Sequence, residues 1–555
     1  MRSENYMKLL KKLQLLVWLA GAAAAVLMLT GAAGSTVSVR AAGRTVTIQS
    51  CLINGSNVTV QMSASSVPSS DDGKIYIVAD EVYQDGTAGE VVGSCAAGSS
   101  ASVSFPLNFN SASSNLDRKF IAAVKQGGTL VQVSDEHYIT NPEAIATHTS
   151  ARMPRGIKGI LPDPTRVNTG ELQDLGIQQV VYNMYVDDIC SAASVPGAIP
   201  YTYNGTTYYF DPTMVGSYDS LITIFNNMGI EVTMVLLNKG TGTYSQDLIH
   251  PLARGGFSSP GYALNVAEAG GVQHLKAVAA FIGERYSGRI GCGQVDNWII
   301  GNEVNARTEW WYTSSSNLDV NVGAYVKAFR IIYNELKAKN ANVQVYNSID
   351  QEWNRKSNSG SFLAKEYLDR FNYYIVREGN IDWGLSYHPY NSPLYDPYAW
   401  NGPAVWVQQS ITTPYITMQN IDILINYMHQ ASFLNPAGQV RSISLAEIGY
   451  TSSFGNDAQE ASIAYGYLKA STLPDVDAFM LFRQTDSSSE MTSHLALGLI
   501  DVNGNHKPAY EIYKKLGTAA QGEAAARASQ IIGTDIINMI TQGVVWTRGG
   551  DGVVQ

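Results

Sequence analysis

Short apolar runs separated by polar turns dominate the chain from residue 43 to residue 140. Within the runs, apolar and polar positions partly alternate, and Gly, Ser, Asn and Asp separate one run from the next. This pattern is typical of antiparallel strands with no intervening helices. We therefore expect a β-sandwich of about seven strands over residues 43–140. Six of the strands are expected at residues 44–49, 57–62, 74–78, 102–107, 119–124 and 129–133.

The pattern changes after a connecting segment, residues 141–155, that contains Pro142 and Pro154. From there, short apolar runs alternate with longer segments whose apolar residues recur with helical spacing. Eight such strands with intervening helices predict an α/β fold, a (β/α)8 TIM barrel, over residues 156–517. The strands are expected at residues 159–160, 179–184, 231–237, 298–300, 343–347, 383–387, 442–447 and 478–482. Residues 518–555 form a C-terminal appendage, Ala-rich and then apolar, that we expect to dock on the barrel as a helix.

Two glutamates each follow directly on an apolar strand. Glu303 ends the stretch V-D-N-W-I-I-G-N-E-V-N, and Glu447 lies in S-I-S-L-A-E-I-G-Y. A buried carboxylate without a partner is costly, so each must be paired or face an open site. Because barrel enzymes carry their sites at the carboxyl ends of the strands, we expect both glutamates at one rim.

These two motifs, together with S-Y-H-P-Y at residues 386–390, resemble the large clan of retaining (β/α)8-barrel glycoside hydrolases. The resemblance covers about residues 150–517. It implies a glycosidase that cleaves O-glycosidic bonds of a poly- or oligosaccharide by double displacement. Glu303 would be the catalytic acid/base after strand 4, and Glu447 the nucleophile after strand 7.

The resemblance also assigns roles to residues around the pair. Asn302 would hydrogen-bond the sugar 2-hydroxyl, and His388 and Tyr390 would orient the nucleophile. Many members of the clan place a Trp at the end of strand 8, where this chain has Phe482-Arg483-Gln484. That departure bears on which sugar the site accepts.

Further candidates for substrate binding come from position and residue type alone. Three amides suited to sugar hydroxyls, Asn183, Asn238 and Asn347, are expected at the ends of strands 2, 3 and 5. Two indoles, Trp310 and Trp353, could stack on sugar faces or fill the core, and so could the neighbouring Trp311.

Other classes of function fit less well. A non-catalytic glycan-binding barrel at the cell surface is the main alternative, and the pair of carboxylates argues against it. A metal- or phosphate-using barrel would need a ligand cluster or a Gly-rich loop that the sequence lacks, so we expect no metal and no cofactor. The net charge of −10 argues against nucleic acid as a partner. The sandwich could bind carbohydrate, but its predicted strands carry no clustered aromatics, which favours a spacer packed on the barrel.

Residues 1–42 have the features of a targeting segment. Lys8, Lys11 and Lys12 precede an apolar run at residues 13–29, and small residues follow up to Ala42. This pattern predicts a signal peptide and a secreted or cell-surface protein, with an uncleaved membrane anchor as the alternative. No other segment is expected to touch a membrane, and the oligomeric state stays open.

Four cysteines allow few disulfides. Cys51 and Cys95 fall in the same β segment and could pair or stay free. Cys190 and Cys292 are expected at opposite levels of the barrel, too far apart for a bond, so we expect both to be free.

Overall fold

The computed structural model describes residues 44–150, 156–255 and 258–541. The expected signal peptide or anchor, part of the connecting segment and the last residues of the appendage lie outside these ranges. Within them, no helix combines the length and apolarity that crossing a membrane requires.

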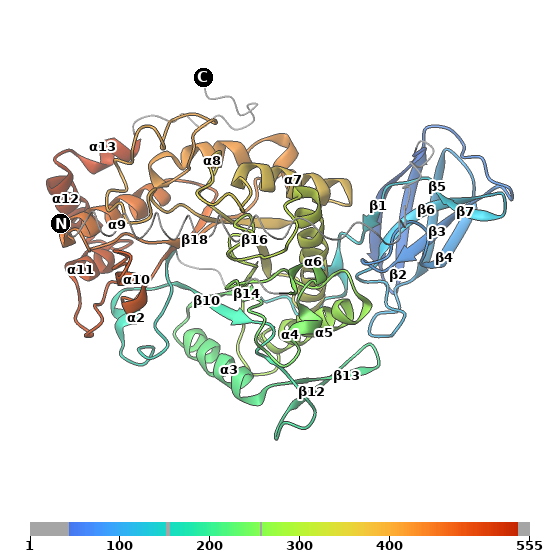
Figure 1. Cartoon of the computed structure of the whole chain (residues 1–555), viewed down its shortest axis with the longest axis horizontal. Helices are drawn as coiled ribbons and strands as arrows, with labels where there is room; N and C mark the ends of the chain where they lie inside the picture. Colours follow the sequence, from blue (N-terminus) through green and yellow to red (C-terminus); the bar gives the residue numbers. More distant parts are fainter. Residues whose placement is uncertain (1–43, 151–155, 256–257, 542–555) are drawn as a thin grey trace, which may run out of the picture. The chain divides into compact units, whose positions relative to one another are not determined.

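The first part of the described chain is a β-sandwich (Figure 1, blue). One sheet has the order β1-β2-β5, and the other has the order β4-β3-β6-β7 with β8 paired to β6. All pairs are antiparallel, and residues from both sheets form one shared apolar core. The strands are β1 Val46–Asn54, β2 Asn57–Ala64, β3 Lys74–Asp80, β4 Glu90–Ala96, β5 Ser100–Pro106, β6 Lys119–Gln126, β7 Thr129–Gln132 and β8 His137–Tyr138.

The sandwich packs against a barrel helix, α6 (Leu318–Lys339). Ala338 of α6 is fully buried in the core of the sandwich, and Asn334 Nδ2 donates a hydrogen bond to the Leu116 carbonyl at 3.0 Å. A short 3₁₀ helix, η1 Pro142–Ile145, also lies on α6. The expected spacer role therefore has a physical basis, while the boundaries at residues 140 and 155 stay predictions.

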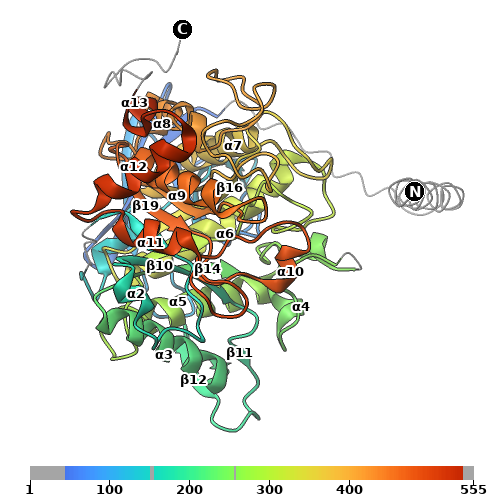
Figure 2. The same cartoon turned by 90° about the vertical axis from the view of Figure 1, so that its left-hand side faces the viewer.

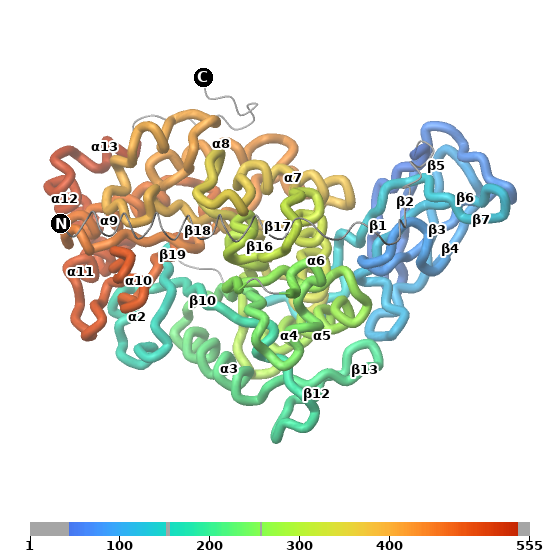
Figure 3. The backbone as a smooth tube through the Cα atoms, in the orientation of Figure 1, coloured from blue at the N-terminus to red at the C-terminus, as the bar shows by residue number. Residues whose placement is uncertain are grey.

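Eight parallel strands close into the predicted barrel, in the order β9-β10-β14-β15-β16-β17-β18-β19 and back to β9. Figure 3 shows β16 beside β17 and β18 beside β19. β14 is buried along its whole length, as expected for a barrel strand whose one face packs on interior side chains and whose other face is covered by helices. The strands are β9 Lys158–Ile160, β10 Gln179–Tyr185, β14 Glu231–Leu237, β15 Asn297–Ile300, β16 Gln344–Asp350, β17 Trp383–His388, β18 Ile443–Ile448 and β19 Val476–Leu481.

Helices surround the barrel, and side chains cap the first turns of α3 and α6. The Asp211 side chain accepts hydrogen bonds from the N–H groups of Thr213 and Met214 at the start of α3, and Asn317 caps α6. The remaining helical segments are α2 Glu171–Asp174, α3 Pro212–Asn227, α4 Ser245–Leu248, η2 Pro251–Ala253, α5 Ala269–Arg285, α7 Ala364–Arg377, η3 Met418–Asn420, α8 Asp422–Met428, η4 Ala431–Phe433, α9 Asn456–Ala470, α10 Ser488–Met491, α11 Pro508–Lys515, α12 Gln521–Ile532 and α13 Ile536–Thr541.

The described part of the appendage is helical, as expected. Helices α12 and α13 lie beside α9 and α11 (Figure 2), and Ala524, Ala528 and Ile536 are buried in the main apolar core. The appendage therefore completes the cover of the barrel and is part of its core.

The sequence analysis missed two features. Strand β4 was missed because its residues do not alternate in burial. A small antiparallel sheet, formed by β11 Cys190–Ser191, β12 Ile199–Tyr203 and β13 Thr206–Phe210, was also missed. Its signal was present: Asn204-Gly205, with φ of 48° and 86°, is a typical hairpin turn between two Thr- and Tyr-rich runs.

All four cysteines are free thiols. This confirms the prediction for Cys190 and Cys292. Cys51 lies on β1 and Cys95 on β4, so the two belong to different sheets.

The burial of Ala338 leads to a test of the contact between sandwich and barrel. Ala338→Asp would put an unpaired carboxylate into the sandwich core and should lower the free energy of unfolding by about 3 kcal/mol. Val320→Asp, at a position of the same helix that is 42% exposed, should change stability by less than about 0.5 kcal/mol. Chemical denaturation monitored by tryptophan fluorescence measures both. Equal losses would contradict the role of Ala338.

Candidate active site

Glu303 sits in a tight turn directly after β15. Gly301 has a φ of +75°, and a Cβ there would lie 2.7 Å from the Val304 side chain, so glycine is required. Glu303 itself has a φ of +39°, which is strained for a residue with a side chain. Its backbone N–H donates to Ser348 Oγ at 3.0 Å, and the N–H of Val304 donates to the Ser348 carbonyl at 2.9 Å. The neighbouring strand β16 thus holds the turn.

Glu447 is turned into the barrel by an irregularity in β18. From Leu445 to Ile448 the strand advances three residues, while its partner β19 advances only two, from Phe479 to Leu481. Such a bulge re-aims side chains. Leu445 and Ile448 both pack in the outer core, while Ala446 packs in the barrel interior. The extra residue lets Glu447 follow Ala446 to the inner side.

His388, the last residue of β17, brings the two carboxyl groups together. Its Nδ1 shares a hydrogen bond of 3.0 Å with Glu303 Oε1 and lies 3.9 Å from Glu447 Oε2. These two oxygens are therefore at most about 7 Å apart, a range that includes the ~5–5.5 Å between the carboxyl groups of retaining glycosidases. The Tyr390 hydroxyl donates to Glu447 Oε1 at 2.8 Å. Tyr390 thus contacts the expected nucleophile, while His388 lies closer to the expected acid/base.

The surroundings of Glu303 favour its protonated form. The pKa of Glu303 is raised to about 8, chiefly by burial and then by the nearby carboxylates of Glu309 and Glu352. The Trp310 indole donates a hydrogen bond to the carboxyl group and opposes this shift. Glu303 is therefore poised to hold a proton at neutral pH.

Glu447 has more support for its charged form. Burial raises its pKa, and the Glu303 carboxylate adds to this, but His388 and the Tyr390 hydrogen bond oppose the shift. The Glu447 side chain is 26% exposed, against 15% for Glu303. Better hydration and a donated hydrogen bond make Glu447 the carboxyl group of the pair that ionises more readily.

The sequence analysis missed a third acid beside the pair. β16 extends to Asp350, three residues beyond the predicted strand end, and the buried Asp350 carboxylate accepts a hydrogen bond from Asn305 Nδ2 at 2.8 Å. Burial, followed by the charges of Glu303 and Glu352, raises the pKa of Asp350 well above its usual range. The alternating segment Y-N-S-I-D at residues 346–350 was the signal for it.

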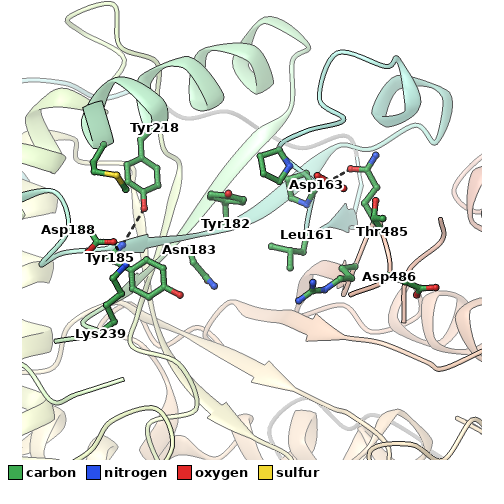
Figure 4. Close-up of a pocket in the computed structure, with 15 residues that line it drawn as sticks. Leu161, Asp163, Tyr182, Asn183, Tyr185, Asp188, Tyr218, Lys239, Thr485 and Asp486 are labelled. Atoms are coloured by element: carbon green, nitrogen blue, oxygen red, sulfur yellow. Dashed lines mark hydrogen bonds and ion pairs between the residues drawn. The ribbon is translucent and has the colours of Figure 1, made fainter. Parts of the chain in front are cut away.

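A cavity of about 570 Å³ opens at the carboxyl ends of β9, β10, β14 and β19 (Figure 4). This volume falls within the range of small-molecule sites. Tyr182, Tyr185, Asn183 and Lys239 line it together with Arg483, as Figure 4 shows for the labelled residues. The lining thus combines aromatic rings with amide and charged groups.

Neither Glu303 nor Glu447 lines the cavity. Phe482 and Arg483, which follow β19, connect the cavity to the carboxyl pair. Arg483 lines the cavity and pairs with Glu490 at 2.7 Å, and Glu490 in turn raises the pKa of Glu447. The Phe482 ring contacts the Tyr390 ring, with centroids 6.4 Å apart. The cavity and the carboxyl pair therefore share one wall.

The structure supports some of the predicted binding residues by position. Asn183 is exposed on β10 and faces the cavity. Asn302 is buried in the turn directly before Glu303. Trp310 contacts the Glu303 carboxyl group, as described above.

Three other predicted binding residues are buried and do not line the cavity. Trp353 is completely buried, with its ring packed edge-on against Tyr427, so it has no face for a sugar. Asn347 is not at a strand end but in the middle of β16, where alternation with inward Tyr346 turns it to the outer core. Asn238 follows β14 as expected, but it is buried and its amide donates to the Leu248 carbonyl. The neighbouring Trp311 is also buried and packs against Tyr325.

Among the described residues, no group of three or more His, Cys, Asp or Glu side chains is placed to hold a metal ion.

Comparison with known proteins assigns the barrel to a family, but the function of that family is unknown. The model of a family of unknown function, DUF5722, matches residues 150–540. None of the curated proteins matches the chain.

The similar solved structures are distant in sequence. A family 39 glycoside hydrolase from the gut symbiont Bacteroides cellulosilyticus WH2 is 14% identical, with a TM-score of 0.41. The match covers 83% of this chain and 80% of that chain. A hyperthermophilic β-glucosidase from Pyrococcus furiosus is 13% identical, with a TM-score of 0.44, and the match covers 67% of this chain and 88% of that chain. A β-D-glucuronidase from Dictyoglomus thermophilum is 11% identical, with a TM-score of 0.35, and the match covers 84% of this chain and 68% of that chain.

The raised pKa of Glu303 predicts a dependence of stability on pH. Its folded-state pKa, about 8, lies above the ordinary 4.5, so between these values the folded state holds a proton that the unfolded state has released. The free energy of unfolding should therefore fall as pH rises through this window. Glu303→Gln cannot ionise, so above pH 8 it should be more stable than the parent by about 5 kcal/mol, a difference that vanishes below pH 4.5.

Denaturant unfolding of the two proteins at several pH values measures this difference. Glu366→Gln, at an exposed position of α7, is the control for removing one carboxylate from the chain. A stability gain for Glu303→Gln that is the same at every pH would contradict the assignment.

Proposed function

The chain belongs to DUF5722, a family whose function is unknown, and we propose that it is a retaining glycoside hydrolase that cleaves O-glycosidic bonds of a poly- or oligosaccharide by double displacement. The observation that carries the proposal is the pair of carboxyl groups at His388, one placed to hold a proton and the other to ionise. Acid and nucleophile of a retaining glycosidase need this division of roles.

In the first step, the Glu447 carboxylate attacks the anomeric carbon. The bond from that carbon to the leaving oxygen breaks, and Glu303 gives its proton to that oxygen. The product is a glycosyl ester on Glu447 and a free leaving alcohol. The Tyr390 hydroxyl, 2.8 Å from Glu447 Oε1, holds the carboxylate in line for the attack.

In the second step, the Glu303 carboxylate removes a proton from water. The water oxygen attacks the anomeric carbon from the face that the leaving group vacated, and the ester bond to Glu447 breaks. Two inversions at one carbon give net retention. His388, hydrogen-bonded to Glu303, keeps this carboxyl group aimed at the same position in both steps.

The cavity beside the pair supplies the binding surface for the sugar. Tyr182 and Tyr185 offer ring faces. The Asn183 amide can donate a hydrogen bond to a hydroxyl group through its NH2 and accept one through its oxygen. Phe482-Arg483-Gln484 stands where many members of the clan have a Trp, and Arg483 brings a charged group to this wall. We expect it to influence which sugar is accepted.

The proposed enzyme acts outside the cell or at its surface. The basic and apolar pattern of residues 1–42 supports export, and a polysaccharide is a substrate of that environment. The alternative, a glycan-binding barrel without catalysis, needs no proton on Glu303 and no hydrogen bond from Tyr390 to Glu447.

Substitution of the two glutamates separates these alternatives. Glu447→Gln keeps the size of the side chain and removes the negative charge that a nucleophile needs. Hydrolysis of aryl glycosides should fall at least ~10³-fold, or ~4 kcal/mol of barrier, while glycan binding persists. Glu303→Ala should instead spare the first step on substrates with good leaving groups and slow the second.

The control is added azide, which needs no general base. It should rescue Glu303→Ala as a glycosyl azide of retained configuration and leave Glu447→Gln inactive. Release of the aryl alcohol and the configuration of the azide by NMR measure the outcome. Unchanged hydrolysis in Glu447→Gln would end the proposal.

The proton on Glu303 also predicts a pH profile. For an aryl glycoside with a poor leaving group, kcat/KM should fall as pH rises through about 8, because Glu303 then loses the proton it must donate. On the acid side it should fall as Glu447 gains a proton. A dinitrophenyl glycoside, which departs without a proton, is the matched control and should lose most of the alkaline decline. The same decline for both leaving groups would contradict the assignment of Glu303.

A further inference from the structure

Exposed aromatic side chains gather on one side of the barrel. Four Tyr, Trp or Phe residues of the described chain rank among the strongly exposed apolar residues, and three of them lie on loops that follow β17 and β18. Tyr395 is 49% exposed, Tyr398 is 45% exposed and Phe454 is 53% exposed. Exposed rings cost free energy in water, so their concentration at one rim calls for a partner.

Two of these rings and a histidine form a continuous row. The centroids of the Tyr395 and Phe454 rings are 6.4 Å apart, and those of Phe454 and His494 are 5.6 Å apart. The rings are tilted by 48° and 38° to one another, so the row presents a bent surface. Its members come from three loops, after β17, β18 and β19. We call Tyr395, Phe454 and His494 the aromatic row.

Hydrogen bonds join the loops that carry Phe454 and His494. Thr451 Oγ1 donates to the His494 carbonyl at 2.6 Å, and the Ala496 N–H donates back to Thr451 Oγ1 at 3.1 Å. The Ser452 N–H also donates to the Ala496 carbonyl at 3.0 Å. The two loops are therefore held as one unit.

The loop of Tyr395 is anchored separately. Asn391 Nδ2 donates to the Asp396 carbonyl at 2.7 Å, and the Tyr398 N–H donates to Asp396 Oδ1 at 3.0 Å. The Ala399 N–H donates to Ser462 Oγ on helix α9 at 3.0 Å. A surface held in place before binding loses little conformational entropy when a ligand arrives.

The loops that carry the aromatic row follow the strand ends at which the carboxyl pair and its neighbours lie. Tyr395 is five residues beyond Tyr390, which donates to Glu447, and Phe454 is seven residues beyond Glu447. His494 is four residues beyond Glu490, whose charge raises the pKa of Glu447. All three loops leave the barrel at its carboxyl end, where the cavity also opens.

We propose that the aromatic row is a binding surface for further sugar units of a glycan chain, beyond the bond that is cleaved. The proposal rests on the proposed function and makes the substrate a polymer. The C–H faces of pyranose rings are apolar and flat enough to stack on aromatic rings, while their hydroxyls stay in water. A row of rings beside a catalytic pair provides affinity for the chain without contact to the reacting sugar.

The first test measures binding without turnover. Glu447→Gln is run by affinity electrophoresis in gels that contain barley β-glucan, xylan, galactomannan, pectin or alginate. In the gel that retards this parent, adding Phe454→Ala should weaken binding at least about fivefold, and Phe454→Trp should retain it. Tyr373→Ala is the matched control, because Tyr373 is 51% exposed on the outer helix α7.

The second test compares substrates of different length in the active enzyme. Phe454→Ala should lower kcat/KM for the same polysaccharide about tenfold and change kcat/KM for an aryl monoglycoside by less than about twofold. A misfolded variant would lose both activities, and Phe454→Trp then decides whether a ring at this position restores the polymer activity.

Three outcomes would overturn the proposal. Equal loss in the Tyr373→Ala control is one, and absence of retardation of the parent in all of the gels is another. The third is light scattering that shows a dimer of the parent and a monomer of Phe454→Ala, which would make a second copy the occupant. The electrophoresis does not depend on hydrolysis, so failure of the proposed function and failure of the aromatic row give different results.

Discussion

The arrangement of this protein depends on the cost of placing two carboxyl groups in one partly buried site. Two negative charges cannot both be held cheaply near one another and out of water. The two carboxyl groups avoid this cost because their surroundings differ. Glu303 is more buried, lies near Glu309 and Glu352 and is favoured as the acid, while Glu447 is more exposed and accepts a hydrogen bond from Tyr390. A difference of this kind is what acid and nucleophile chemistry requires.

Backbone features of the barrel hold this difference in place. The strained turn at Glu303 would relax without the Ser348 hydroxyl and carbonyl on β16. The bulge in β18 brings Glu447 to the inner side of a strand whose flanking residues pack outward. β17 then supplies His388 at its last position. Four adjacent barrel strands thus contribute to one site.

The prediction of the fold rested on apolar runs and succeeded where burial is complete. β14 was predicted with its observed bounds because every residue in it is buried. The ends of other strands were less certain, because a strand can continue into polar residues that face a site. β16 illustrates this: its polar segment Asn347 to Asp350 was interpreted as the end of the strand, which misplaced Asn347 and missed Asp350. Trp353 was misjudged for a related reason, since composition does not separate a ring in the core from a ring at a binding surface.

The sequence by itself determined the order of the elements and the two glutamates at strand ends. Both follow from local patterns, because alternation, apolar runs and polar strand ends are visible without knowing what lies opposite. Only the tertiary structure decided what surrounds those glutamates. The approach of His388 to both carboxyl groups, the hydrogen bond from Tyr390, the acids around Glu303 and the row of Tyr395, Phe454 and His494 join segments up to about 150 residues apart. Protonation and stacking depend on distances across the barrel, and these exist only once its strands have closed.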